Sequence, residues 1–315
     1  MTGANQLSAS EFLLLWLSRE PEQQQQQQLL FMLFLSMYLA SVLGNLLIIL
    51  AISMDAHLHN PMYFFLSNLL FVEICFTSTT IPKTLVNHIL GSQTISYPGC
   101  LTQMYFFIAF INMDHCLLAV MAYDLFVAVC HPLHYTTKMT PQLCALMVSG
   151  YWVIANLHAL LYTLLTAGLS FCAYNRISHF FCDVAPLLKL TCSDTHISEM
   201  VILTEGGQIM ITPLICILVS YFCITCDVLK ISSAKGRWKA FSTCGSHLSV
   251  LSFFYGIVFA VYFSLSSTHS AENDIAAAVM YTAVTPMVNP FIYSLRNKDM
   301  KVSLRNMMGR KREST

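Results

Sequence analysis

Seven apolar stretches, each long enough to cross a lipid bilayer, occupy most of this 315-residue chain. A hydrocarbon core about 30 Å thick needs roughly 20 predominantly apolar residues in a helix. A soluble domain of this length cannot bury seven such segments, so the pattern predicts an all-α membrane protein, a bundle of seven transmembrane helices. The predicted spans are Leu29–Met54, Pro61–Ile81, Leu101–Cys130, Leu143–Ala167, Met200–Cys226, Ala240–Leu265 and Ile275–Ser294.

The distribution of basic residues predicts the orientation of the bundle. With the N-terminus outside, the cytoplasmic connections and the C-terminal tail hold twelve of the 16 Lys and Arg residues, the excess that cytoplasmic loops show. These twelve are Lys138, Lys230, Lys235, Arg237, Lys239, Arg296, Lys298, Lys301, Arg305, Arg310, Lys311 and Arg312. We therefore expect an extracellular N-terminus and a cytoplasmic C-terminus. The net charge of zero gives no reason to expect a nucleic-acid partner, and the partner surface is the lipid bilayer.

The chain is predicted to form one domain over residues 1–315. It divides into an extracellular tail (1–28), the helix bundle (29–294) and a cytoplasmic tail (295–315). Residues 1–28 lack the basic start and apolar core of a cleavable signal peptide, so the first span is expected to act as the membrane anchor. The glutamine run Gln23–Gln28 is interpreted as a solvated spacer without packed structure.

The twelve cysteines divide by position. Cys100 and three cysteines of the long connection 168–199 lie on the predicted outer side: Cys172, Cys182 and Cys192. Four cysteines in an oxidising compartment favour two disulfides, and the residues alone do not choose among the three pairings. Those inside the spans are expected to be small packing residues.

Two acidic side chains are predicted at comparable membrane depth, where ionisable groups are costly and usually functional. Glu73 lies in the second span and Asp114 in the third, which indicates a shared cation or a shared proton. The alternative is one protonated acid hydrogen-bonded to a polar neighbour such as Asn45, Ser67 or Asn289. Two orientations of a further acid, Glu205 in the fifth span, stay open: into the bundle or toward the outer interface.

Six sequence blocks lie in order along the predicted helices. They are Leu43–Asn45, Pro61–Leu69, Met121–Asp124, Ser220–Tyr221, Lys239–Leu248 and Pro286–Asn297. In this order the chain closely resembles the vertebrate odorant receptors, a branch of the rhodopsin-like G-protein-coupled receptors. The resemblance extends from about residue 11 to residue 305. It implies location in the plasma membrane, in the cilia of olfactory sensory neurons. It further implies binding of a volatile odorant and signalling through a stimulatory heterotrimeric G protein that raises cAMP.

The resemblance also assigns site residues. It pairs Cys100 with Cys182 and Cys172 with Cys192. The residues that it matches to the switch and the G-protein-coupling surface are Asp124, Leu125, Tyr221, His247, Asn289, Pro290 and Tyr293. Among these, Pro290 leaves a helical carbonyl without its donor and permits a kink. Glu73 and Asp114 match an acidic pair that binds a sodium ion in some related receptors, and no cofactor is required.

The predicted ligand cavity lies in the outer half of the bundle, as an apolar pocket with a few hydrogen-bonding groups. Helical spacing places the third-span members on nearby turns. The candidate residues are Phe107, Ile108, Ile111, Asn112, Glu205, Tyr255, Val258, Phe259, Tyr262 and Thr282, with Tyr255 at the floor and Thr282 added by the resemblance. Phe107 occupies the position where amine receptors carry an acid, so a cationic amine agonist is disfavoured. We expect a small, volatile, weakly polar ligand.

The chain departs from the family pattern at three places. Leu125 replaces an arginine that the neighbouring aspartate holds at rest and that meets the G protein in the active state. Glu73 replaces an aspartate, and no Asn-x-Ser/Thr sequon occurs in the chain. The first departure favours an alternative function, a folded but poorly coupling or non-signalling member of the same family.

Two other function classes are less favoured. The sequence contains neither a G-x-S-x-G nor an H-E-x-x-H motif, so we do not expect an enzyme. A membrane transporter typically has interrupted helices that meet at mid-membrane, and it would need more buried charges than this chain carries.

Overall fold

The computed structural model describes residues 11–14, 24–171, 176–177, 179–238, 244–245, 247–253, 255–256, 275–276 and 278–313. Within these residues, five helices are long and apolar enough to cross a bilayer. Each contains one of the first five predicted spans. They are α1 (Gln24–Met54), α2 (Pro61–Leu90), α3 (Tyr97–Cys130), α5 (Pro141–Ala167) and α7 (His196–Leu229).

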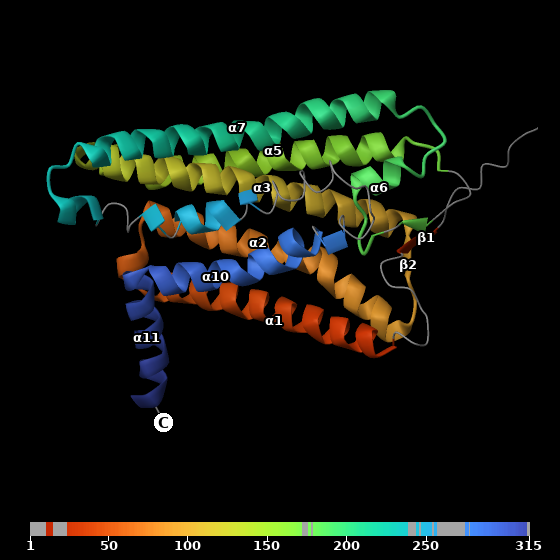
Figure 1. The fold of residues 1–315 in the computed structure, drawn as a ribbon, viewed down its shortest axis with the longest axis horizontal. Helices are drawn as coiled ribbons and strands as arrows, with labels where there is room; N and C mark the ends of the chain where they lie inside the picture. Colours follow the sequence, from red (N-terminus) through yellow and green to blue (C-terminus); the bar gives the residue numbers. More distant parts are fainter. Residues whose placement is uncertain are drawn as a thin grey trace, which may run out of the picture.

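The last two predicted spans are described in part. Residues 244–245, 247–253 and 255–256 of the sixth span are helical. The seventh contains a π-helical turn, η4 (Met280–Val284), that continues into α10 (Thr285–Arg296). After it, α11 (Lys298–Glu313) points away from the bundle (Figure 1). The short elements are η2 (Ala56–Leu58), η3 (Pro132–His134), α4 (Tyr135–Lys138) and α6 (Val184–Leu188).

Polar caps followed by proline begin three of the long helices. The side chains of Asn60, Ser96 and Thr140 accept a hydrogen bond from the first helical turn, and each helix carries proline in its first two positions. Proline suits this position because the first amides of a helix have no intrahelical acceptor. These local signals explain why α3 and α5 begin earlier than their apolar stretches.

Two predictions at helix ends were wrong. The second span was expected to end at Ile81, but α2 continues through Pro82 to Leu90, where Gly91 ends it with φ 60°. The glutamine run was expected to be unstructured, but α1 begins at Gln24. Glutamine is a good helix former, so the run extends a helix that the apolar segment already stabilises. Membrane thickness sets the length of the apolar part only.

A small three-stranded sheet closes one end of the bundle and was not predicted. Its central strand, β1 (Glu11–Leu14), pairs antiparallel with β2 (Thr94–Ser96) and parallel with β3 (Arg176–Ile177). The sheet lies at the end opposite α11 (Figure 1), as a chain with its termini on opposite membrane faces requires. Phe12 and Leu14 of β1 are 0% and 1% exposed, so the N-terminal strand is part of the packed structure.

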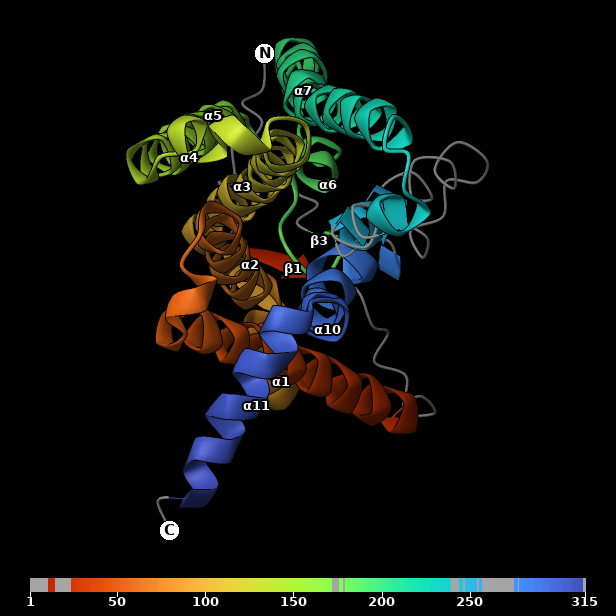
Figure 2. The same cartoon turned by 90° about the vertical axis from the view of Figure 1, so that its left-hand side faces the viewer.

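The third helix is the centre of the bundle. Seen along the bundle in Figure 2, α3 lies between α2 and α5. Its Met113 and Leu117 are fully buried, whereas Leu157 of α5 and Phe222 of α7 are 62% and 70% exposed. Large apolar side chains exposed on the outward faces of long helices are expected where the surroundings are lipid.

Candidate functional site

The outer half of the bundle contains an aromatic cluster around Phe107. Its ring centroid lies 4.7 Å from that of Phe181, 5.1 Å from that of Phe76 and 6.1 Å from that of Tyr281. Phe107 is 5% exposed, and Ile108 and Ile111 pack against the same cluster. The side chains that α3 contributes to this cluster are therefore apolar.

Asn112 is the polar exception on this part of α3. It is 7% exposed, and among the described residues its Nδ2 has no hydrogen-bond partner. A buried amide without an acceptor is costly, because desolvation of the N–H groups is not compensated. Asn112 is thus able to donate to a bound molecule.

The remaining predicted cavity residues lie in different settings. Tyr255 Oη is 3.4 Å from His115 Nδ1, which links the sixth span to α3. Thr282 is fully buried, and its hydroxyl donates to the Ala278 carbonyl at 2.7 Å. Val258, Phe259 and Tyr262 lie outside the described residues.

Glu205 meets a partner that sequence reasoning did not name. Its Oε2 is 3.4 Å from Nε2 of His158 on α5, and the Glu205 side chain is 40% exposed. The contact ties α7 to α5 in the outer half of the membrane. The sequence shows a histidine in the fourth span and an acid in the fifth. Only the packing of the two helices shows that these side chains face each other.

The segment from His179 to Cys182 enters the bundle. His179, Phe180, Phe181 and Cys182 are 4%, 1%, 0% and 0% exposed. The disulfide Cys100–Cys182 confirms the first predicted pairing and joins residues 82 apart in the sequence. Burial lowers the pKa of His179 to about 4, so its ring is neutral, and burial raises the pKa of Asp183.

The second predicted pairing stays a prediction. Cys192 is disulfide-bonded, and Cys172 lies outside the described residues. The backbone next to Cys172 lies beside the backbone next to Cys192. Phe171 and Thr191 form a β-bridge, and the Cys192 amide donates to the Ser170 carbonyl at 2.9 Å.

A small cavity lies deeper in the bundle, between α2, α3 and the seventh span. Its volume is about 10 Å³, and Glu73, Asp114 and Asn289 are among its lining residues. Asn289 Nδ2 donates to Glu73 Oε1, which was one of the expected alternatives. One oxygen of each of these three residues is buried without a hydrogen-bond partner among the described residues: Glu73 Oε2, Asp114 Oδ1 and Asn289 Oδ1.

Pro290 directly follows Asn289 in the chain and leaves a helical carbonyl without its donor. Proline has no amide hydrogen for the carbonyl four residues earlier, which belongs to Pro286. Asn45 Nδ2 of α1 donates to that carbonyl at 3.1 Å. The helix α1 packs closely here, since a Cβ at Gly44 would lie 3.2 Å from Pro290 Cγ and the two helices would have to separate slightly to admit it.

The cytoplasmic end holds the remaining switch residues. The hydroxyl of Tyr135 on α4 donates to Oδ1 of Asp124 at 2.9 Å. Tyr221 Oη lies 2.7 Å from His247 Nδ1, which connects α7 to the sixth span. Tyr293 is 5% exposed.

Leu125 is buried rather than presented to the cytoplasm. It is 6% exposed and packs in an apolar cluster with Ile224, Val228 and Cys244, which are 0–1% exposed. The cluster joins α3, α7 and the sixth span. We refer to these four residues as the inner apolar cluster.

The described residues thus form a bundle of membrane-spanning helices with an aromatic cluster in its outer half, a small cavity beside two carboxyl groups at mid-depth and an apolar cluster at its cytoplasmic end. A family model described as "Olfactory receptor" matches residues 34–311. Olfactory receptor 1F1 of Homo sapiens is 68% identical over 98% of each chain. Olfactory receptor 1f45 of Rattus norvegicus is 67% identical over 98% of this chain and 97% of its own.

The chain therefore belongs to the olfactory receptor family. It is a multi-pass G-protein-coupled receptor of the plasma membrane with the family's seven-helix bundle, and it is not an enzyme. Olfactory receptor 1M1 of Mus musculus, 54% identical over 99% of this chain and 98% of its own, agrees with this assignment.

Proposed function

We propose that the receptor binds a small, volatile, weakly polar odorant in the outer half of the bundle. Binding then favours a state that couples to a stimulatory heterotrimeric G protein and raises cAMP in the cilia of olfactory sensory neurons. The observation that carries the ligand class is Asn112, a buried side-chain donor without a partner among the described residues, on an otherwise apolar wall.

The chemistry of this wall selects among odorants. An aldehyde, ketone or ester offers a carbonyl oxygen to the Asn112 amide and an alkyl chain to the aromatic cluster. A cationic amine would lose its hydration without gaining a carboxylate near Phe107. A ligand shifts the receptor only through a higher affinity for the active state.

Substitution of Asn112 tests this proposal. We would express the receptor and its Asn112→Leu variant and measure cAMP responses to straight-chain aldehydes and ketones and to the matching hydrocarbons. We expect Asn112→Leu to raise the half-maximal concentration of the carbonyl compounds by about tenfold, the effect of one neutral hydrogen bond. Ile111→Leu, on the same turn and without a donor, is the control. An equal loss for carbonyl compounds and hydrocarbons would reject the assigned role.

We further propose that the deeper cavity holds a sodium ion or a proton. The unpartnered oxygens of Glu73, Asp114 and Asn289 converge on a space about the size of a water molecule, and oxygen ligands suit a hard cation. The ion would supply a positive charge between two carboxylates. The test is the thermal unfolding midpoint of the purified receptor in sodium chloride against choline chloride. We expect sodium to raise the midpoint and Asp114→Asn to abolish the effect, while Asp124→Asn retains it.

A specific observation favours a second candidate, a receptor that couples poorly. Leu125 replaces the arginine that meets the G protein, and it is buried in the inner apolar cluster. Apolar contacts in this cluster hold the cytoplasmic ends of the helices together. Leu125 has no charged group to offer the G protein when these ends separate. We would compare cAMP output of the natural chain and of Leu125→Arg at equal surface expression. A response only from the variant supports poor coupling, and equal responses reject it.

A further inference from the structure

The inserted segment His179–Cys182 packs on the aromatic cluster around Phe107, and we refer to this segment as the ceiling. Phe181 is fully buried and its ring lies 4.7 Å from that of Phe107, while Phe180 packs at 5.8 Å against Phe34 of α1. The side chains of this segment thus contact the wall on which the ligand is proposed to bind. The position of these side chains therefore bounds the region in which the ligand is proposed to bind.

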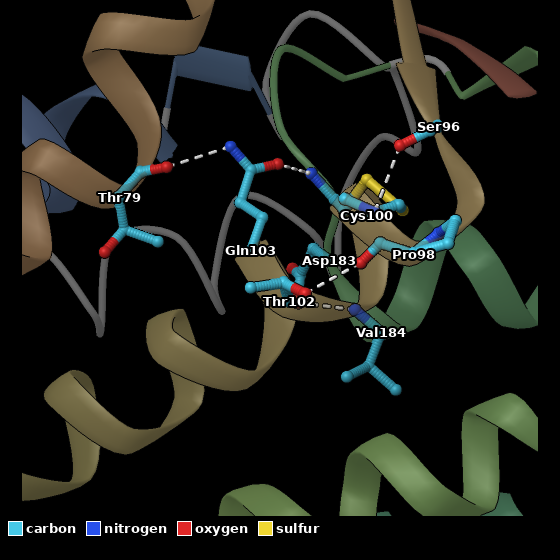
Figure 3. Close-up of a disulfide and its surroundings, with 10 residues drawn as sticks. Thr79, Ser96, Pro98, Cys100, Thr102, Gln103, Asp183 and Val184 are labelled. Atoms are coloured by element: carbon cyan, nitrogen blue, oxygen red, sulfur yellow. Dashed lines mark hydrogen bonds between the residues drawn. A yellow bond between two sulfur atoms is a disulfide. The ribbon is translucent and has the colours of Figure 1, made fainter.

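One side chain, Gln103 of α3, bonds the backbone of this segment. Its Oε1 accepts from the Cys182 amide at 2.9 Å, and its Nε2 donates to the Thr79 carbonyl of α2 at 3.0 Å. Figure 3 shows the Gln103 carboxamide between the two, beside the Cys100–Cys182 disulfide. Gln103 is 7% exposed, so both bonds are shielded from water and left without replacement if the side chain changes.

The Thr79 carbonyl lies in the turn that precedes Pro82 of α2. Proline lacks the amide that would bond the carbonyl four residues earlier, which belongs to Ser78. Gln103 bonds the next carbonyl along the chain, that of Thr79, and so supports α2 beside the position that lacks its donor. At Pro290 the Asn45 carboxamide donates to the freed carbonyl itself, that of Pro286.

The disulfide by itself does not orient the ceiling. It joins one sulfur of the loop to α3, and rotation about the side-chain bonds of Cys182 stays available. The hydrogen bond from the Cys182 amide restricts the peptide between Phe181 and Cys182, and therefore the direction of the Phe181 ring. A third contact, from Thr84 Oγ1 to the Phe180 carbonyl at 3.3 Å, ties the same segment to α2 beyond Pro82.

We propose that Gln103 is a positioning residue for odorant recognition. It holds Phe181 against Phe107 by linking the Cys182 amide to the Thr79 carbonyl of α2, and so selects the length of the ligand. This inference rests on the proposed odorant chamber. Gln103 itself does not touch the ligand.

Amide hydrogen exchange of the purified receptor tests the positioning step without any ligand. Gln103→Met keeps the length of the side chain and removes both bonds, whereas Gln103→Glu keeps an acceptor for the Cys182 amide. Thr102→Val is the control, because Thr102 is the neighbouring residue and bonds only the Pro98 carbonyl of its own helix. We expect Gln103→Met to speed exchange in residues 179–184 by about tenfold, and Gln103→Glu to have the smaller effect. Unchanged exchange in Gln103→Met would overturn the proposal.

A functional readout separates positioning from general structural support. We would measure cAMP responses to straight-chain aldehydes of increasing length in the Leu125→Arg background, at matched surface expression. We expect Gln103→Met to change which length has the lowest half-maximal concentration, with the maximal response retained. A uniform loss at all lengths would reject selection of ligand length. If no aldehyde activates the parent, the proposed ligand class fails, and the exchange experiment still decides whether Gln103 holds the ceiling.

Discussion

At the scale of single residues, the receptor depends on side chains that satisfy backbone groups of other helices. Asn45 donates to the Pro286 carbonyl, which Pro290 leaves without its amide, and Gln103 donates to the Thr79 carbonyl, next to the one that Pro82 leaves free. Pro82 and Pro290 are visible in the sequence, and so are the carbonyls that they leave free. Which carboxamide supplies each donor depends on helix packing, and for that reason Gln103 was not among the predicted site residues.

Replacement of Asn45 tests the cost of an unsatisfied carbonyl. Asn45→Ala leaves the Pro286 carbonyl buried without its donor, so we expect the free energy of unfolding to fall by about 1–3 kcal/mol. Thermal unfolding of the purified receptor measures it. Ser41→Ala is the matched control, because Ser41 is also fully buried on α1 and its contact with Asn45 is long, at 3.4 Å. An equal fall in both variants would assign the effect to packing rather than to the carbonyl.

His179 makes the outer loop sensitive to acid. Its pKa is about 4 in the fold against 6.5 for the free side chain, and the rings of Phe180 and Phe181 face it. Between these pH values the unfolded chain binds a proton that the folded chain does not. Stability is therefore complete above pH 6.5 and is lost as the pH falls toward 4.

We expect the free energy of unfolding to fall by on the order of 2 kcal/mol between neutral pH and about pH 5. Asp183 acts in the opposite direction, because burial raises its pKa. Comparison with His179→Phe isolates the histidine contribution, and unfolding midpoints across this pH range provide the measurement. The same acid sensitivity in His179→Phe would assign it to other groups.

At the scale of elements, the cytoplasmic ends of α3, α7 and the sixth span are joined by the inner apolar cluster. Cys244 is 1% exposed within it and provides a native thiol reporter. Leu125→Ala removes apolar contacts at its centre, so we expect faster labelling of Cys244 by a maleimide in membranes open to the cytoplasmic side. Truncation of a buried leucine to alanine costs about 2–5 kcal/mol. We therefore expect the rate of Cys244 labelling to rise by at least about tenfold.

Two variants make this measurement specific. Cys244→Ser identifies the labelling due to the seven other free cysteines among the described residues. Val127→Ala removes a fully buried apolar side chain of α3 that packs in the main core instead of the cluster. Equal labelling in Leu125→Ala and Val127→Ala would mean that the cluster does not hold the cytoplasmic end closed.

At the scale of the whole molecule, the N-terminal segment joins outer loops that are far apart in the sequence. The central strand β1 lies between residues 94–96 and 176–177. Phe12 contacts Phe171 and Tyr97 with ring centroids 5.4 Å and 6.1 Å apart, next to the disulfide-bonded core. The outer end is therefore closed by three separate parts of the chain.

Truncation of Phe12 tests this role. Phe12→Ala should lower the free energy of unfolding by about 3–5 kcal/mol, as expected for a fully buried phenylalanine. Leu13→Ala is the control, because successive residues of a strand point to opposite faces and Leu13 is only partly buried. Surface expression and thermal unfolding are the measurements. Equal effects of the two substitutions would show that β1 is not packed as described.

The sequence by itself determined the fold class, the five described spans and the start of α2 at Pro61. Length, apolarity and caps act locally, between a segment and its surroundings, so they can be read without knowing the packing. The resemblance added the Cys100–Cys182 pairing, which the residues alone had left among three alternatives.

Only the tertiary structure decided the contacts between distant parts: β1 in the outer sheet, Gln103 between Thr79 and Cys182, Tyr135 on Asp124 and His158 on Glu205. Each joins groups whose approach depends on how the helices rotate and lean against one another. A hydrogen bond requires its atoms within about 3 Å, and helix periodicity leaves such positions undetermined until every neighbouring helix has packed.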